Sequence, residues 1–174
     1  MNAPLLRIKT SLQEHIQDLL NKQIAMEAHS CAIYLAMSAW CSVHGLQESA
    51  KFYRKQSGEE REHMLRIFDY VAEVGGYAIS PQVTNVPQTF DNLFDVLSRA
   101  LEQEIKITES FNYMTDECHK AKDYQTAKFL QWFLNEQLEE EKTARRAIEI
   151  YELIGTEGDA LFKIDHQIGK LAEG

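Results

Sequence analysis

The sequence predicts an all-α protein, a four-helix bundle that carries a short fifth helix at its C-terminal end. The first observation is composition: the 174 residues include only 8 Gly and 3 Pro, and long stretches are rich in residues that favour helices. The second is periodicity, because these stretches repeat apolar residues at alternating three- and four-residue steps, the spacing that faces a neighbouring helix. The length suits one domain with a sizeable core, which we expect to cover residues 1–174.

Glycines and one capping residue set the expected limits of the helices. Gly45 follows the first helical stretch as a C-cap, the Gly75–Gly76 pair stops the second, and Gly155 follows the fourth. Asp91, a good N-cap residue, precedes the third stretch. Helices are therefore expected over residues of about 11–44, 46–74, 91–119, 124–154 and 158–171.

The connections between these helices predict the topology of the bundle. Gly45 and residues 120–123 make short connections, which force antiparallel neighbours. Residues 77–90 contain Pro81 and Pro87 and form the longest loop. A helix of about 30 residues is about 45 Å long, and a loop of about 15 residues stretches to about 50 Å. The loop can therefore run the length of the bundle and set the third helix parallel to the second, which gives an up-down-down-up bundle with one long crossover.

Charge and cysteine content restrict the class of partner and the compartment. The net charge of −9 disfavours nucleic acid and anionic membranes as partners and favours cations. Cys31, Cys41 and Cys118 form no Cys-x-x-Cys pair, and their odd number argues against a disulfide framework. We expect a cytoplasmic protein, because the first residues lack the apolar core of a signal peptide and no apolar run is long enough for a membrane span.

The apolar seam of each long helix is interrupted near its middle by polar residues. Glu27 precedes Gly45 by as many residues as His63 follows it, so the two share a level in the first hairpin. The polar groups of the second hairpin lie at a similar depth. Unpaired charges in the middle of a bundle cost several kcal/mol each, so a multivalent cation is expected to neutralise them. The residues expected in this layer are Glu27, Glu60, His63, Glu104, Gln137 and Glu140.

These ligand types favour particular metals. Carboxylates with one imidazole suit iron or manganese better than a thiolate-rich zinc or copper site, although zinc remains a competitor. Bridging carboxylates hold two ions about 3.5–4 Å apart, and two irons can each pass one electron to O2. Tyr34 lies two helical turns after Glu27 on the same face, where it can donate an electron or a hydrogen bond. A tyrosine of the core without a redox role fits the pattern equally well.

Several segments of the chain resemble the bacterial non-haem ferritins, and the resemblance covers nearly the whole sequence. The matching segments are Met-Ser-Ala-Trp-Cys at 37–41, Glu-Glu-Arg-Glu-His-Met at 59–64, Phe-Asp-Tyr at 68–70, Phe-Leu-Gln-Trp at 129–132 and Asn-Glu-Gln-Leu-Glu-Glu-Glu-Lys at 135–142. The resemblance implies a ferritin-like fold and a hollow shell of twenty-four subunits with the fifth helix at its four-fold axes. It also implies ferroxidase activity, in which Fe(II) is oxidised by O2 or peroxide and stored as ferric mineral.

The same resemblance implies roles for individual residues. Glu60 would bridge the first two irons, with Gln137 beside the second iron and Tyr34 beside the centre; these three are the expected catalytic residues. The implied ligands of the first two irons are Glu27, Glu60, His63 and Glu104. The implied carboxylates of a third iron are Glu59, Glu136, Glu139 and Glu140, for which a solvated acidic face is the alternative interpretation.

Three departures from related families qualify these expectations. Di-iron oxygenases and bacterioferritins carry a second Glu-x-x-His, whereas this chain has Gln137 and Glu140, which favours turnover of iron over a permanent cofactor. Arg61 stands where bacterioferritins have their haem-ligating methionine, so no haem is expected. Ala127 and Leu130 stand where animal ferritins have acidic residues in a three-fold pore, so iron entry by that pore is not expected.

Two other functions remain as alternatives. One is a di-iron peroxidase or oxygenase acting on an organic substrate, which the missing second Glu-x-x-His disfavours. The other is a DNA-protecting mini-ferritin, which the net acidity and the fifth helix oppose. The fifth helix is also expected to be unable to bury its apolar face alone and to pack with copies from neighbouring subunits. That face comprises Leu161, Ile164, Ile168 and Leu171.

Overall fold

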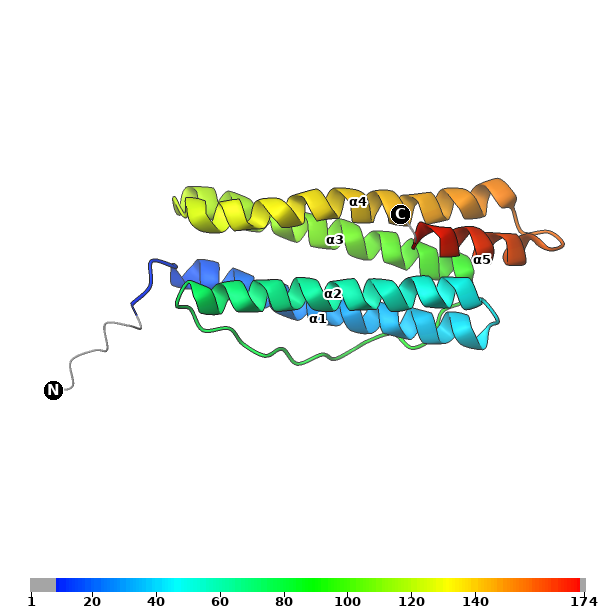
Figure 1. Ribbon diagram of the computed structural model, residues 1–174, viewed down its shortest axis with the longest axis horizontal. Coiled ribbons are helices and arrows are strands. Elements are labelled where there is room, and N and C mark those ends of the chain that lie inside the picture. Colours follow the sequence, from blue (N-terminus) through cyan, green and yellow to red (C-terminus); the bar gives the residue numbers. More distant parts are fainter. Residues whose placement is uncertain (1–8, 173–174) are drawn as a thin grey trace.

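The computed structural model describes residues 9–172 as five α-helices, without a strand in that range (Figure 1). The all-α fold class is thus confirmed. No helix in that range combines the length and the apolar character needed to cross a bilayer. The helices are α1 (Glu14–Val43), α2 (Gln47–Glu73), α3 (Leu93–Lys120), α4 (Tyr124–Ile154) and α5 (Ala160–Leu171).

The helices form two antiparallel hairpins, α1 with α2 and α3 with α4, as predicted (Figure 1). The connection after α2 runs the length of the bundle, so that α3 begins at the end where α2 began and lies parallel to it. Two side chains of α1 hold the start of this loop. Gln17 Oε1 accepts from the Tyr77 amide at 2.8 Å, and Asn21 Oδ1 accepts from the Ile79 amide at 2.9 Å. These bonds replace the backbone partners that an extended segment lacks.

Two helix starts differ from the prediction because side chains there bond elsewhere. The first helix begins at Glu14 and not near residue 11, since Thr10 Oγ1 accepts from the Leu12 amide and donates to the Val74 carbonyl. The third helix is capped by Asn92 and not by Asp91: the Asn92 side chain accepts from the Asp95 amide at 3.0 Å. Both corrections concern N-caps, where one side-chain hydrogen bond decides the first helical residue.

The apolar core is split into two clusters by a polar layer. Ile24, Ile67 and Phe133 belong to the cluster at the end where α1 begins. Met37 and Leu97 belong to the cluster at the end where α5 packs. The middle of the bundle, between the two clusters, contains the buried polar side chains that the seams predicted. Apolar packing on both sides therefore holds these polar groups away from water.

The fifth helix packs on α2 and α4 of its own chain (Figure 1). Ile164 and Ile168 are fully buried there, so the prediction that this face needs neighbouring subunits is wrong for these two residues. The reason is an added polar contact: Asp165 accepts from the amides of Ser49 at 2.7 Å and Glu48 at 3.2 Å, and so caps N–H groups at the start of α2 that have no partner within the helix. Leu161 remains half exposed.

Candidate metal centre

Three buried side chains from two helices converge in the polar layer. Glu27 comes from α1, and Glu60 and His63 lie one turn apart on α2. One potential ligand atom from each lies within 4.8 Å of the other two. The His63 Nδ1 atom is 3.5 Å from Glu60 Oε2. Within residues 9–172 this is the one group of three or more acidic, histidine or cysteine side chains with that spacing.

Each of these side chains has one buried polar atom without a hydrogen-bond partner among the described residues. The atoms are Glu27 Oε2, Glu60 Oε2 and His63 Nδ1. An unpaired buried polar atom costs about 1–3 kcal/mol, and more when it is charged, so three in one place indicate a missing partner. Two carboxylate oxygens and an imidazole nitrogen are ligands that a divalent cation such as Fe(II) accepts together. The residues present therefore fit iron.

The second hairpin contributes Glu104 from α3 and Gln137 from α4. Both are buried in the same layer. Tyr34 of α1 donates its hydroxyl proton to Glu104 Oε1, and Gln137 Nε2 donates to Glu104 Oε2 at 3.0 Å. Gln137 also donates to the Glu104 carbonyl at 3.3 Å. Each carboxylate oxygen of Glu104 thus accepts one hydrogen bond and keeps a second lone pair that could bind a metal.

Burial is the main cause that raises the pKa of the carboxyl groups in this layer. The pKa of Glu27 is raised well above its ordinary value, and the charge of Glu60 is the second cause. The pKa of Glu60 is also raised well above its ordinary value, and there the second cause is the charge of Glu104. Burial and the Glu104 charge raise the pKa of Glu140 to about 7. Burial likewise raises the pKa of Tyr34, so its phenol stays protonated. A bound cation opposes these shifts, because it stabilises the ionised carboxylates.

Of the four carboxylates expected at a third iron, Glu140 belongs to the edge of this layer and Glu59, Glu136 and Glu139 lie outside it, so the four are only partly brought together. Glu59 and Glu136 line one open groove between α2 and α4, and His63 lines the same groove. Glu140 is half-buried, and the charge of Glu59 contributes to its raised pKa. Glu139 is exposed and pairs with Lys142 at 3.1 Å on its own helix. The groove thus joins two of the four outer carboxylates to the buried centre.

Several hydrogen-bond partners of the centre had no assigned role at the level of sequence. Ser110 donates to Gln23 Oε1 at 2.5 Å, and Gln23 donates to Glu27 Oε1 at 2.7 Å, which leaves the other Glu27 oxygen free. Gln56 donates to Glu140 Oε2 at 2.8 Å. Gln23 and Gln56 both fall on the inward seams, one turn before Glu27 and Glu60, and this is the signal that could have found them.

Aromatic contacts hold the imidazole ring of the centre. Trp132 and Phe133 meet the His63 ring edge to face, with centroids 5.5 and 5.9 Å away. Arg66 lies over Trp132, with its guanidinium carbon 3.9 Å from the ring centroid. Trp132 and Arg66 also line the groove that reaches His63. The imidazole therefore has a defined orientation before any metal binds.

The raised pKa values predict that the metal-free protein loses stability as the pH rises. A group whose pKa is higher in the folded state stabilises the fold below its unfolded pKa, and this contribution is lost as the pH rises through the folded pKa. For Glu140, a rise from 4.5 to about 7 corresponds to about 3 kcal/mol, lost between about pH 4.5 and pH 8. Urea unfolding of the metal-free protein across this range measures the effect.

Two variants and saturation with one metal ion serve as controls for this measurement. Glu140→Gln removes one titrating group and reduces the pH dependence to the part that Glu27 and Glu60 contribute, whereas Glu139→Gln changes an exposed glutamate of the same helix and keeps the parental slope. Saturating Zn(II) reverses the trend, because the cation binds the ionised carboxylates. Equal slopes for the parent and both variants would show that burial of Glu140 has no such consequence.

Comparisons with known proteins agree with this architecture. The model of the ferritin-like domain family matches residues 17–154. A probable bacterial non-heme ferritin-like protein of Haemophilus influenzae is 35% identical over 92% of this chain and 98% of its own length. A bacterial non-heme ferritin of Campylobacter jejuni is 34% identical over 92% of this chain and 96% of its own.

A solved structure extends the likeness to three dimensions. The open pore ferritin of the hyperthermophilic archaeon Archaeoglobus fulgidus superposes with a TM-score of 0.88 at 31% identity, over 91% of this chain and 98% of that one. The ferritin-like topology inferred from loop lengths is therefore the observed one. With a family model over most of the chain and relatives above 30% identity along nearly their whole length, this chain belongs to the ferritin family.

Proposed function

We propose that the protein stores iron and that it is a ferroxidase, with Fe(II) oxidised at a di-iron centre inside each subunit. The observation that supports this most is the set of three unpartnered ligand atoms on Glu27, Glu60 and His63, buried between two apolar clusters. In this proposal iron is the substrate, and the centre binds it, oxidises it and releases it toward a mineral.

Each residue of the layer has a distinct role in the proposed reaction. Glu60 lies within ligand distance of Glu27 and His63, and the charge of Glu104 raises its pKa, which suits a bridge between two irons. Two Fe(II) ions each give one electron to the oxidant and become Fe(III), whose higher charge the carboxylates favour. Gln137 stands where a second Glu-x-x-His would supply a ligand, and its neutral amide oxygen is a weaker ligand than a carboxylate or an imidazole, so the second iron is held less tightly than the first. That asymmetry favours release of the product over its retention.

Tyr34 is the proposed donor beside the centre. Its hydroxyl already donates to Glu104, and its ring is buried. When Glu104 turns to bind iron, this hydrogen bond positions the carboxylate or, if Tyr34 is oxidised, passes the phenol proton to it. The first role needs only geometry, whereas the second also needs an electron to leave the ring.

Iron loading tests the proposal against its alternatives. Fe(II) added in air to metal-free protein should give a fast oxidation phase that saturates at two irons per subunit, followed by slower mineral growth far beyond that ratio. A di-iron oxygenase would stop near two irons per subunit, so the final iron content separates the two functions. Binding of Zn(II) at the same residues should inhibit the fast phase, since zinc competes for these ligands but supplies no electron.

Storage requires an enclosed space, which one subunit lacks. We therefore infer a homo-oligomeric shell, and the family relationship makes twenty-four subunits the expected number. The three cysteines form no disulfide, and burial raises the pKa of Cys41 to about 12, which keeps it a thiol. Reduced cysteines agree with a cytoplasmic location. Sizing of the purified protein distinguishes a shell from a free subunit.

We also propose a third iron held by the outer carboxylates Glu59, Glu136, Glu139 and Glu140. Replacing Glu136 with alanine should leave the fast oxidation of the first two irons intact, since Glu136 contacts only the groove. The number of irons oxidised per O2 should fall toward about two, because two irons supply only the two electrons that reduce O2 to peroxide. Stopped-flow oxidation with an oxygen electrode measures both quantities.

Glu62→Ala provides the matched control for this prediction. Glu62 lines the same groove and is exposed, but it is not an expected ligand. Its removal should change neither the rate nor the ratio. If Glu136→Ala behaves as Glu62→Ala does, and crystals soaked in Fe(II) hold no metal beside Glu59 and Glu136, the outer carboxylates are a solvated acidic face.

A further inference from the structure

Two hydrogen bonds in series lead from α3 to Glu27 of the candidate centre. The Ser110 hydroxyl of α3 donates to Gln23 Oε1 at 2.5 Å, and Gln23 Nε2 donates to Glu27 Oε1 at 2.7 Å. Gln23 and Glu27 are buried, whereas Ser110 is half-buried. The path therefore begins at a partly exposed hydroxyl group and ends at a proposed metal ligand.

The Gln23 amide has one orientation that satisfies both of its neighbours. An ionised carboxylate only accepts hydrogen bonds, so the amide nitrogen must face Glu27 whenever a cation is bound there. The Ser110 hydroxyl then donates to the amide oxygen at the other end. Because both ends of the amide are bonded in this orientation, the Gln23 side chain is fixed before an ion arrives.

The two oxygens of Glu27 are consequently unequal. Oε1 accepts from Gln23, whereas Oε2 is buried and has no partner among residues 9–172. Glu60 Oε2 and His63 Nδ1 are buried without a partner in the same layer. A cation gains most from a buried atom whose lone pairs are all free, because that atom has given up its water without a replacement. The hydrogen bonds thus leave Glu27 Oε2 as the atom for a cation shared with Glu60 and His63.

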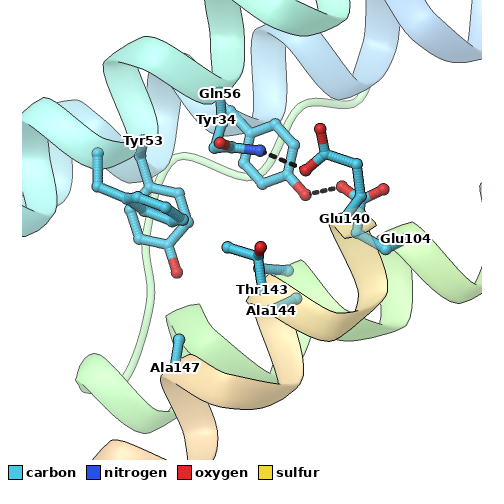
Figure 2. A pocket seen from close by; sticks show the side chains of 10 residues that line it. Tyr34, Tyr53, Gln56, Glu104, Glu140, Thr143, Ala144 and Ala147 are labelled. Atoms are coloured by element: carbon cyan, nitrogen blue, oxygen red, sulfur yellow. Dashed lines mark hydrogen bonds between the residues drawn. The ribbon is translucent and has the colours of Figure 1, made fainter. Parts of the chain in front are cut away.

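Two other carboxylates of the layer are bonded across the hairpins. Figure 2 shows Gln56 of α2 bonded to Glu140 of α4. It also shows Tyr34 of α1 bonded to Glu104 of α3. Glu27 differs, because its donor lies one turn earlier on the same helix and only the next residue in the series belongs to the other hairpin. The orientation of Glu27 therefore depends on two residues in series.

We infer that Gln23 and Ser110 are positioning residues for Glu27, which hold its carboxylate so that Oε2 binds the first metal ion of the centre. The inference rests on the proposed function, since it takes Glu27 as a ligand of iron. A ligand that is already oriented loses less freedom when the ion binds, so the two residues raise the affinity for that ion.

Zn(II) tests this role without any oxidation step. Gln23→Leu removes the amide and keeps a side chain of similar size. Its Zn(II) affinity, measured by competition with a chromogenic chelator, should fall by about ten- to a hundredfold. Ser110→Ala removes only the anchor of the amide, so its affinity should fall by about three- to tenfold. Ser110→Thr keeps the hydroxyl group and should restore the parental affinity.

A second glutamine–serine pair between the same two helices provides the matched control. Gln103 Nε2 of α3 donates to the Ser30 hydroxyl of α1 at 2.7 Å. Within residues 9–172 neither side chain is hydrogen-bonded to an expected metal ligand. Gln103→Leu therefore removes the same kind of bond and should keep the parental Zn(II) affinity. If Gln23 only joined the helices, Gln23→Leu and Gln103→Leu would have the same affinity.

Crystals soaked in Zn(II) separate failure of this inference from failure of the proposed centre. Parent crystals should contain an ion bound to Glu27 Oε2, with the bond from Gln23 intact. In Gln23→Leu crystals the carboxylate should turn, so that the ion is bound by both oxygens or lost. An unmoved Glu27 with parental Zn(II) affinity in Gln23→Leu would overturn the inference and leave the centre in place. Parent crystals without an ion beside Glu27 would refute both the centre and the inference.

Discussion

Replacing Glu60 with alanine is expected to abolish the fast oxidation phase, with a loss of about two or more orders of magnitude in rate. Glu60 lies within ligand distance of Glu27 and His63, and the charge of Glu104 raises its pKa, so its removal deprives both proposed irons of a shared ligand. Loss of correctly placed reacting groups has effects of about this size in enzymes. Stopped-flow absorbance after mixing metal-free protein with Fe(II) in air measures the phase.

The same substitution should make the metal-free protein more stable at neutral pH. The pKa of Glu60 is raised in the folded state, so its ionised form destabilises the fold, and a neutral residue relieves that cost. Glu60→Gln is the sharper variant for this readout, because it keeps the shape of the side chain and leaves no void. We expect lower activity together with higher apo stability, a combination that a misfolded variant cannot produce.

Glu62→Gln controls for the substitution itself, since Glu62 is an exposed glutamate on the same helix. It should alter neither the fast phase nor the unfolding curve by a measurable amount. Parental oxidation of two irons per subunit by Glu60→Ala would show that the centre has been assigned to the wrong residues.

Deletion of residues 156–174 is expected to lower the free energy of unfolding of the subunit by on the order of 3–6 kcal/mol. Two fully buried isoleucines, Ile164 and Ile168, account for about 1.5–3 kcal/mol each through burial alone. The Asp165 carboxylate adds to this, because its removal leaves the Glu48 and Ser49 amides without that acceptor. Denaturant unfolding of the truncated and full chains measures the difference.

Point variants distinguish the contribution of α5 to subunit stability from its contribution to the proposed shell. Ile168→Ala should cost about 2–5 kcal/mol in subunit stability, whereas His166→Ala, an exposed change on the same helix, should cost almost nothing. Leu161→Ala alters a half-exposed side chain that one chain leaves uncovered, so it should affect the proposed shell more than the subunit. If the truncated chain and the full chain gave the same unfolding curve, the packing of α5 on α2 and α4 would be contradicted.

The fold could be predicted from the sequence because its determinants are local. Helical periodicity is set by residues three and four apart, and Gly45 and Gly155, which follow helices, adopt positive φ values of 80° and 78° that glycine tolerates best. The two short connections and the one long loop then favoured the up-down-down-up topology over the alternatives. Counting residues from the turns also grouped Glu27 with His63, because equal distances from one hairpin reach equal depths in a bundle.

The tertiary structure decided which side chains contact one another across helices. Those contacts depend on the rotation of each helix about its axis and on the rotamers of its side chains. Tyr34 lay near the centre by sequence spacing, but only the packing of α1 against α3 brings its hydroxyl to Glu104. The stacking of Tyr53 on Tyr34 likewise joins two helices, and no periodicity of either helix encodes it. The contact of Asp165 with the start of α2 likewise exists only because α5 folds back onto that helix. Spacing along one helix fixes the level of a side chain, whereas its partner is chosen by contacts between segments far apart in the chain.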